Sequence, residues 1–457
     1  MNFRELVAEL DSRGDLLCVR KEVHPEYELP ALLALAEKRG KACRFERVAG
    51  SAFPAVGAVL TSPNRWAVGL GLSSGGFDEP NVLEQTIADA VAAPLAATVR
   101  ESGPVCEIVI DGDDVDTAAL PVPRFFSGDS HRFITAGIGF ALNPETGVQN
   151  AGFYRMPVIG PRTVSVSTGP TSDLSRIYNL HRERGTKLQI AVAVGVSPAL
   201  QIAAAADLPA GLSDIDVAGS LQRAPVELVK CRTSDILVPA DAELVIEVTV
   251  DLDTSIENTM GEFGDQYGTT TSPVATINAI THRNDAMFHV IMAGMGREHN
   301  ELGRLMCYRL RGEILESLQN RHPIIKDVFT DMTPPRMGMR GQITVSVDKT
   351  DDEQPRQIIE DIYSLKFGRF PLSMLIQRVV VVDTDVNIRD HQDIEWAIAS
   401  RMNRAGQFAV TESQTGRGAT VTRLGCDATA PMEQRSALRR PEIPAVGQYD
   451  LDRYLAD

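Results

Sequence analysis

The stretch VELVKCRTSDILVPADAELVIEVTVDL, residues 226–252, indicates the fold class of this chain. Its two apolar runs, 226–231 and 242–252, are rich in Val, Ile and Thr and partly alternate apolar with polar positions, as strands do. Six further segments share this pattern and are expected to be strands: 106–112, 133–143, 163–168, 188–196, 274–283 and 286–294. So many strands with few long helices between them predict a closed or folded β-rich domain with helical insertions at 105–302.

Both flanks of this block alternate helical and strand-like patterns instead. The first residues, MNFRELVAELDSRG, place apolar side chains on one face of a helix, and the segment 28–40 continues the alternation. We therefore expect one α/β domain over residues 1–104 and another over 303–430. The tail, 431–457, ends in a short helical segment, YDLDRYLAD, whose apolar side chains are expected to dock on a neighbouring subunit.

Composition and charge exclude several classes of protein. The 457 residues carry a formal net charge of −16, which disfavours nonspecific binding to nucleic acid or to anionic membranes. The most apolar stretch, 188–208, is interrupted by Ser197, Pro198 and Gln201, so no membrane span is expected. The N-terminus lacks the basic and apolar regions of a signal peptide. Six scattered cysteines without a C-x-x-C pair predict free thiols in a reducing, cytoplasmic compartment.

The segment NAGFYRMPVIG, 150–160, combines an amide and a guanidinium in one extended run. Asn150 and Arg155 are five residues apart, an odd separation that puts their side chains on opposite faces of a strand. One side chain can then face a cofactor while the other faces a substrate. An Arg fork suits a carboxylate, although a surface Arg in a salt bridge is the simpler reading of this pattern alone.

Two acidic segments are further candidates. In ENTMGEFGDQYG, 257–268, Glu262 and Asp265 lie three residues apart, and a carboxyl held in an apolar pocket can deliver a proton. In GLSDIDVAGS, 211–220, Asp214 supplies oxygen ligands of the kind that suit Mg²⁺ or Mn²⁺. The simpler alternatives are an acidic loop and the acidic first turn of a helix. No HExxH or G-x-S-x-G motif is present, so zinc and serine hydrolases are not favoured.

Several segments in this order resemble the UbiD family of decarboxylases. The resemblance covers about residues 1–425, is strongest over 119–290, and is carried by the following segments: 119–138, 150–155, 195–200, 208–219, 226–247 and 378–401. Members of the family use prenylated FMN to remove CO2 from aromatic or α,β-unsaturated acids. The resemblance implies an α/β (α+β) protein of three parts, in which a β-rich, split-barrel-like flavin domain lies between α/β domains at the N- and C-terminal ends.

The resemblance also assigns roles to individual residues. Arg155 stands at the family's catalytic Arg, and Asp265 at its proton-donating acid. Asn150 stands at an Asn that binds the divalent metal of the flavin phosphate, and Asp214 at a metal-binding Glu. The other cofactor contacts that the resemblance implies are Tyr154, Arg378 and the backbone of Ala204, Ala205 and Ala206.

This chain departs from the family pattern at three places. The family's first catalytic Glu falls on Met260, so Glu262 is the only other nearby acid that could join Arg155 and Asp265. The family's metal-binding His falls within Thr171–Asp173, where Ser172 is expected to take its place. A family Lys near the flavin phosphate falls on Gln377, beside Arg378.

The resemblance implies a non-oxidative, reversible decarboxylation in which Asp265 returns a proton to the substrate carbon. An uncharged, polarisable Met260 favours a bulky heteroaromatic acid such as phenazine-1-carboxylate. The implied cofactors are prenylated FMN, Mn²⁺ or Mg²⁺, and K⁺, and the implied partners are a UbiX-type flavin prenyltransferase and further copies of this chain. A relative that binds flavin or an aromatic acid without chemistry is the alternative. A plain FMN oxidoreductase is disfavoured because no nicotinamide signature is present.

Overall fold

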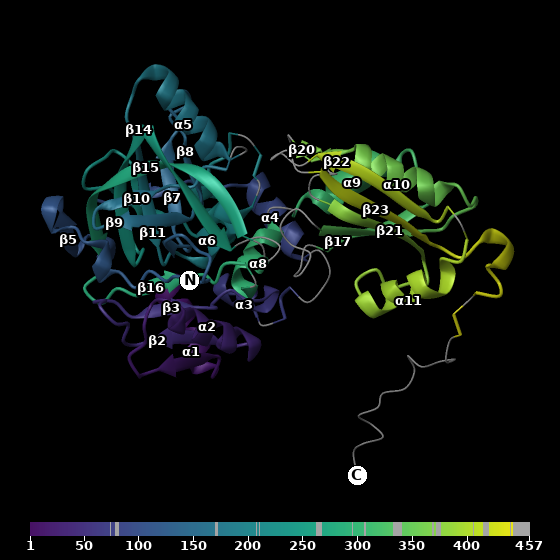
Figure 1. Ribbon diagram of the computed structural model, residues 1–457, viewed down its shortest axis with the longest axis horizontal. Coiled ribbons are helices and arrows are strands. Elements are labelled where there is room, and N and C mark those ends of the chain that lie inside the picture. Colours follow the sequence, from purple (N-terminus) through teal and green to yellow (C-terminus); the bar gives the residue numbers. More distant parts are fainter. Residues whose placement is uncertain are drawn as a thin grey trace, which may run out of the picture. The chain divides into compact units, whose positions relative to one another are not determined.

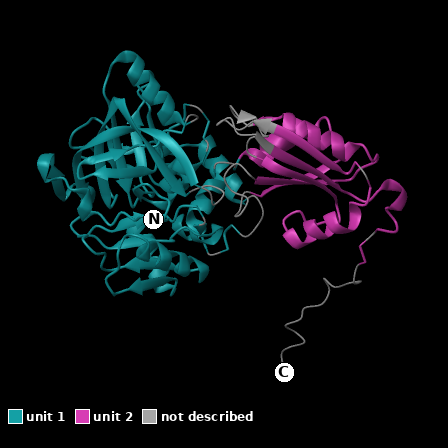
Figure 2. Cartoon of the chain, viewed as in Figure 1, with its two compact units in different colours: residues 1–308, 332–338 teal, residues 309–331, 339–457 magenta. Residues whose placement is uncertain are grey.

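The computed structural model describes most of the chain, in two compact units (Figures 1 and 2). The first unit holds residues 1–308 and 332–338, and the second holds 309–331 and 339–457. The first two domains expected from the sequence thus share one unit. The structure describes all residues except 74, 78–81, 170–171, 207, 210, 262–266, 295, 306–307, 332–340, 368–369, 372–375, 405, 415–419, 439 and 442–457.

The first unit opens with a four-stranded sheet in the order β1-β2-β3-β16. Its strands are β1 (Leu16–Val19), β2 (Ala42–Phe45), β3 (Ala55–Gly57) and β16 (Phe288–Val290). The segment 286–294 therefore forms a strand, as predicted, but it pairs in parallel with β3 rather than joining the β-rich block around it in the sequence. Apolar patterning predicts that a strand is buried, and it does not say which sheet buries it.

Four helices accompany this sheet: α1 (Phe3–Ser12), α2 (Glu28–Lys38), α3 (Pro63–Gly69) and α4 (Val82–Ala92). In α1 the side chain of Asn2 accepts a hydrogen bond from the amide of Glu5, whose carboxylate accepts one from the amide of Asn2. This capping box fixes the first turn. The helix buries the apolar face expected from its sequence, which consists of Phe3, Leu6, Val7 and Leu10.

A nine-stranded antiparallel sheet forms the middle of the first unit. Its path is β6-β9-β10-β15-β14-β11-β7-β8, and β5 pairs with β15. The strands are β5 (Ile108–Asp111), β6 (Arg132–Ile134), β7 (Ile138–Leu142), β8 (Gln149–Phe153), β9 (Met156–Gly160), β10 (Thr163–Ser165), β11 (Leu188–Val194), β14 (Leu244–Gly261) and β15 (Tyr267–His282). This sheet is the β-rich part that the sequence predicted.

The strands β14 and β15 extend well beyond the strands expected at 242–252 and 274–283. Their register continues past an irregularity, from Ser255 opposite Pro273 to Gly261 opposite Tyr267. The added part is rich in Thr, Ser and Asn, which lack the apolar alternation on which the prediction rested. These polar side chains bond across the two strands, as Thr259 does with Thr269 at 2.9 Å.

Four helices and a small sheet complete the first unit. The helices are α5 (Asp173–Arg184), α6 (Pro198–Ala205), α7 (Asp214–Leu221) and α8 (Arg297–Leu305). The small sheet, in the order β13-β12-β4, contains β4 (Thr98–Val99), β12 (Glu227–Lys230) and β13 (Leu237–Pro239). The strand predicted at 226–231 is therefore present, but it lies outside the central sheet.

The second unit is an α/β fold on a five-stranded sheet in the order β17-β18-β21-β23-β22. Its strands are β17 (Ile325–Asp331), β18 (Gly341–Val347), β21 (Ile376–Asp383), β22 (Phe408–Gln414) and β23 (Thr420–Ala428), with a short pair β19 (Lys366–Phe367) and β20 (Phe370–Pro371). Its helices are α9 (Leu310–Gln319), α10 (Gln354–Ser364) and α11 (His391–Arg401). Across the residues described in both units, no helix is long and apolar enough to span a membrane.

Candidate active site

Tyr154 determines the geometry around Asn150, and two glycines make its position possible. Gly139 and Gly152 lie opposite each other on β7 and β8. A Cβ atom at Gly139 would lie 2.7 Å from the Tyr154 ring, and one at Gly152 would lie 2.8 Å from its hydroxyl oxygen. The ring therefore lies back over both strands, and its hydroxyl donates to Oδ1 of Asn150 at 2.9 Å.

The side chain of Asp214, the first residue of α7, also lies next to Asn150. Its Oδ2 accepts a hydrogen bond from the backbone amide of Ala151 at 2.8 Å, next to Asn150. Desolvation of this carboxyl, together with the charge of the nearby Asp173, raises the pKa of Asp214 to about 7. Burial together with Asp214 and Asp173 also raises the pKa of Tyr154. The fold thus brings the Asp214 carboxylate next to Asn150 and close enough to Asp173 for the two carboxyl groups to interact electrostatically.

Ser172 and Asp173 lie at the start of α5. The Ser172 hydroxyl caps the helix, because it accepts from the amide of Ser175 at 3.1 Å and donates to the carbonyl of Gly169 at 2.9 Å. The carboxylate of Asp173 follows in the first turn, where the helix dipole favours an anion. Thr171 lies outside the described residues.

The side chains in this corner suit a hard divalent cation. The available donors are the Asn150 amide oxygen and the carboxylates of Asp214 and Asp173, and oxygen ligands are the ones that Mg²⁺ and Mn²⁺ prefer. A cation would also offset the charge of Asp173, which contributes to the raised pKa of Asp214. Nowhere in the described part of the chain do three His, Cys, Asp or Glu side chains gather into a metal cluster.

Arg155 lies between β8 and β9, so the strand alternation that predicted opposite faces for it and Asn150 does not run unbroken between the two residues. Its Nε donates to the Ser167 hydroxyl at 3.2 Å and its Nη2 to the Thr270 hydroxyl at 3.3 Å. Thr270 in turn donates to Oδ1 of Asn258 at 3.3 Å. A chain of neutral groups from β14 and β15 therefore orients the guanidinium.

Met260 lies two residues beyond Asn258, on the same face of β14. Its side chain is 1% exposed and belongs to a hydrophobic cluster. The next residue, Gly261, is anchored because its amide donates to Oδ1 of the buried Asp129 at 2.8 Å. The two acids that the sequence singled out, Glu262 and Asp265, follow Gly261 and lie outside the described residues.

His299 is a neighbour of Arg155 that sequence reasoning missed. It lies on α8, and desolvation, together with the positive charge of Arg155, lowers its pKa to about 4. The imidazole is therefore neutral near pH 7. Nothing local in the sequence marks this residue, since it follows Arg155 by more than a hundred positions and only the fold brings the two into electrostatic contact.

The remaining predicted cofactor contacts divide between the two units. Ala204 and Ala205 end α6, and Ala206 follows in an extended conformation. Both α6 and α7 pack against β8, which carries Asn150. Arg378 belongs to β21 of the second unit, where its Nη2 pairs with Glu395 at 2.6 Å and its Nε donates to Gln342.

Three protein-family models match this chain in order. They describe the N-terminal domain (residues 7–80), the Rift-related domain (97–296) and the C-terminal domain (305–422) of 3-octaprenyl-4-hydroxybenzoate carboxy-lyase, UbiD. A protein of Archaeoglobus fulgidus is 29% identical over 430 residues, which cover 90% of this chain and 86% of that protein.

Solved structures with this fold include UbiD-class enzymes. The structure of HmfF from Pelotomaculum thermopropionicum in complex with FMN matches with a TM-score of 0.86 and 29% identity, over 99% of this chain and 100% of that one. The open form of vanillic acid decarboxylase from Sedimentibacter hydroxybenzoicus matches in fold, with a TM-score of 0.81 and 22% identity over 99% of this chain and 97% of that one.

Proposed function

The chain belongs to the UbiD family of carboxy-lyases, and we propose that it uses prenylated FMN to remove CO2 from an aromatic or heteroaromatic carboxylic acid. One observation supports the proposal: the residues to which the family resemblance assigns cofactor and substrate contacts, Asn150, Asp214 and Arg155, lie around the end of β8. Asn150 accepts a hydrogen bond from Tyr154, and the amide of the neighbouring Ala151 donates to Asp214. Arg155 donates to the hydroxyls of Ser167 and Thr270.

Asn150 and Asp214 are proposed to hold the divalent ion, Mn²⁺ or Mg²⁺, that binds the flavin phosphate. Ser172 was the third ligand expected from the sequence. Since its hydroxyl already caps α5, we favour the neighbouring Asp173, whose carboxylate interacts electrostatically with Asp214. An ion here would draw the pKa of Asp214 down from about 7 and keep both carboxylates ionised at neutral pH.

Prenylated FMN, when bound, supplies the electron sink that a departing CO2 requires. Arg155 is proposed to bind the substrate carboxylate, because a guanidinium fork pairs with a carboxylate through two parallel hydrogen bonds. Ser167 and Thr270 fix the orientation of that fork. The neutral His299 nearby adds no second positive charge to this side of the site.

Asp265 is proposed to return a proton to the substrate carbon after CO2 has left, and Glu262 is the alternative acid. The segment that carries both begins at Gly261, whose amide Asp129 holds. The buried Asp129 carboxylate also accepts from the amides of Phe125 and Phe126 at 3.2 and 2.9 Å. The start of the acid-bearing segment is therefore fixed to the rest of the domain.

The substrate is proposed to have a large apolar ring system. Met260 replaces the Glu that the family pattern places there, and its 1% exposure puts it within the hydrophobic cluster rather than in solvent. A polycyclic heteroaromatic acid such as phenazine-1-carboxylate has the matching chemistry. We further propose that a UbiX-type flavin prenyltransferase supplies the cofactor and that the working enzyme is a dimer or a larger assembly of this chain.

The proposal is tested by producing the protein together with a flavin prenyltransferase. Mass spectrometry of the released cofactor should show prenylated FMN, and a panel of aromatic and heteroaromatic acids should show CO2 release from at least one polycyclic member. Bound prenylated FMN without CO2 release from any acid would indicate a binding protein instead. Failure to bind flavin at all would overturn the proposal.

A further inference from the structure

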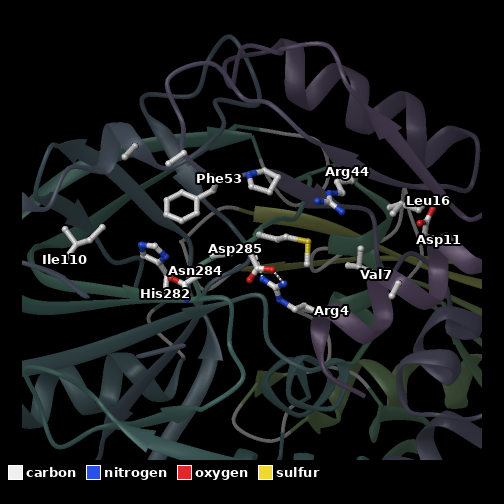
Figure 3. Close-up of a pocket in the computed structure, with 16 residues that line it drawn as sticks. Arg4, Val7, Asp11, Leu16, Arg44, Phe53, Ile110, His282, Asn284 and Asp285 are labelled. Carbon is white, nitrogen blue, oxygen red and sulfur yellow. Dashed lines mark hydrogen bonds and ion pairs between the residues drawn. The ribbon is translucent and has the colours of Figure 1, made fainter. Parts of the chain in front are cut away.

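A cavity of about 610 Å³ lies in the first compact unit, and none of the residues assigned to the candidate active site lines it (Figure 3). Its walls come from α1, from β1 and β2, from the segment 52–54 and from the residues that join β15 to β16. This volume falls within the range of about 300–1,000 Å³ that small-molecule sites occupy. The cavity is large enough for an organic ligand with a ring.

Most of the wall is apolar. The edge of the His282 ring packs against Phe53, with the ring centroids 4.9 Å apart and the planes at 89°. Figure 3 shows Phe53 and Ile110 toward one end of the cavity and Leu16 toward the other. The apolar side chains that line the cavity are Val7, Ala8, Leu16, Ala52, Phe53, Pro54, Ile110, Ala119, Ala286 and Met287.

The guanidinium of Arg4, which lines the cavity, is already paired with two carboxylates. Arg4 donates from Nε and Nη2 to the two carboxylate oxygens of Glu243, at 2.7 and 2.9 Å. Its Nη1 donates to Asp285 at 2.6 Å. Both carboxylates are therefore paired with Arg4, and the Arg4 guanidinium is satisfied without a ligand.

The guanidinium of Arg44, by contrast, has a nitrogen that lacks a hydrogen-bond partner. It lies on β2 between the buried Cys43 and Phe45, and it lines the cavity. Its Nε is buried and finds no hydrogen-bond acceptor among the residues that the structure describes. A desolvated N–H without an acceptor costs stability and is rare in native proteins. Arg44 is thus a charged donor in a wall that also holds the paired Arg4 and Asp285 and the carboxylate of Asp11, and a ligand in the cavity can supply an acceptor for its guanidinium.

We propose that this cavity is a second ligand-binding site that takes a small organic carboxylic acid. The ligand carboxylate pairs with the guanidinium of Arg44, and the apolar body of the ligand packs against Phe53, Ile110 and Met287. A guanidinium fork and a carboxylate form two parallel, charge-assisted hydrogen bonds. The site binds its ligand whether or not the protein holds flavin, so the inference is independent of the proposed decarboxylation.

The test is a calorimetric titration of the full-length protein with 2-naphthoate, in the Arg155→Met background so that the candidate active site does not contribute. Replacing Arg44 by Met should weaken binding at least about ten-fold, since a charge-assisted pair is lost. The matched control is Arg39→Met, which removes an exposed Arg at the end of α2 that does not line the cavity. The neutral 2-naphthamide should bind more weakly than 2-naphthoate.

A second variant separates binding from folding. Ala8→Trp fills the cavity from the exposed face of α1 and should abolish binding while Arg44 stays in place. In the absence of ligand, Arg44→Met should melt at the same temperature as its parent or higher, because it removes an unsatisfied donor. Equal affinity with and without Arg44, no heat at millimolar 2-naphthoate, or a lower melting temperature for Arg44→Met would each overturn the proposal.

Discussion

Around Asn150 the candidate site gathers charge, whereas around Arg155 it gathers neutral hydroxyl and amide groups. The first side holds two carboxylates, Asp173 and Asp214, and burial together with the charge of Asp173 raises the pKa of Asp214. The second side orients one guanidinium through Ser167 and Thr270. The difference shows how one strand end can serve two purposes: carboxylates suit a cation and its phosphate, and hydroxyl groups orient a guanidinium that suits a substrate carboxylate.

If the chemistry takes place beside Arg155, the largest loss of activity should come from replacing Asp265. Asp265→Asn keeps the shape of the side chain and removes the proton, so turnover should fall by about 10²–10⁴-fold while flavin stays bound. The rate of CO2 release and the flavin absorbance measure the two quantities. Glu262→Gln is the matched control and should retain most of the activity. The reverse result would make Glu262 the acid and Met260 a sign of a shifted motif.

If the Asn150 side performs binding, its loss should remove the cofactor rather than slow the reaction. Asn150→Ala deletes the amide oxygen proposed for the ion and the acceptor of the Tyr154 hydroxyl. The purified protein should contain less than about a tenth of the wild-type flavin and divalent metal, as measured by absorbance and elemental analysis. Full retention of both would place the phosphate site elsewhere.

A smaller loss of stability and flavin binding should follow from a substitution near Asn150 that replaces none of the proposed metal ligands. Gly152→Ala places a Cβ atom 2.8 Å from the Tyr154 hydroxyl, so the ring must move away from Asn150. We expect a loss of about 1–3 kcal/mol in stability and a weaker hold on flavin. The control is Gly160→Ala, where the nearest atom would lie at an ordinary 3.6 Å. Equal melting temperatures for the two variants would contradict this account of Tyr154.

The same two sides differ in how far the sequence predicts them. Local spacing predicts an extended segment around Asn150, and β8 and β9 form there. It does not predict that Tyr154 and Arg155 fall between these two strands. Hydrophobic patterning likewise predicts the core strands of the central sheet. It does not predict the polar extension of β14 and β15, which pairs through Thr, Ser and Asn.

Long-range placement is the part that local patterns do not predict. The strand β16 pairs with β3, far from it in the chain, and His299 approaches Arg155 only because α8 folds back toward the central sheet. The choice between Ser172 and Asp173 also depends on tertiary contacts. The sequence permits either residue as a ligand, and only the cap of α5 shows that the Ser172 hydroxyl is already engaged.

The smallest expected effect is on how stability depends on pH, to which Asp214 and His299 contribute with opposite signs. In metal-free protein, the pKa of Asp214 is raised to about 7, so folded Asp214 keeps a proton that the unfolded chain releases near pH 4. This group therefore makes the protein less stable as pH rises from about 4 to 7. The pKa of His299 is lowered to about 4, so the unfolded chain gains a proton below about pH 6.5 that the folded chain does not take up. This group makes the protein less stable as pH falls through the same window.

The two contributions oppose each other in the wild-type protein, and single substitutions should reveal them. Asp214→Asn should make the slope of unfolding free energy against pH more positive between pH 4 and 6.5, and His299→Gln should make it more negative. Each change should be about 1 kcal/mol per pH unit or less, because both groups are partly exposed to water. Urea unfolding at four pH values, with a chelator present, measures both slopes. Slopes that move in the same direction would show that the two sides of the site do not differ in charge as the structure indicates.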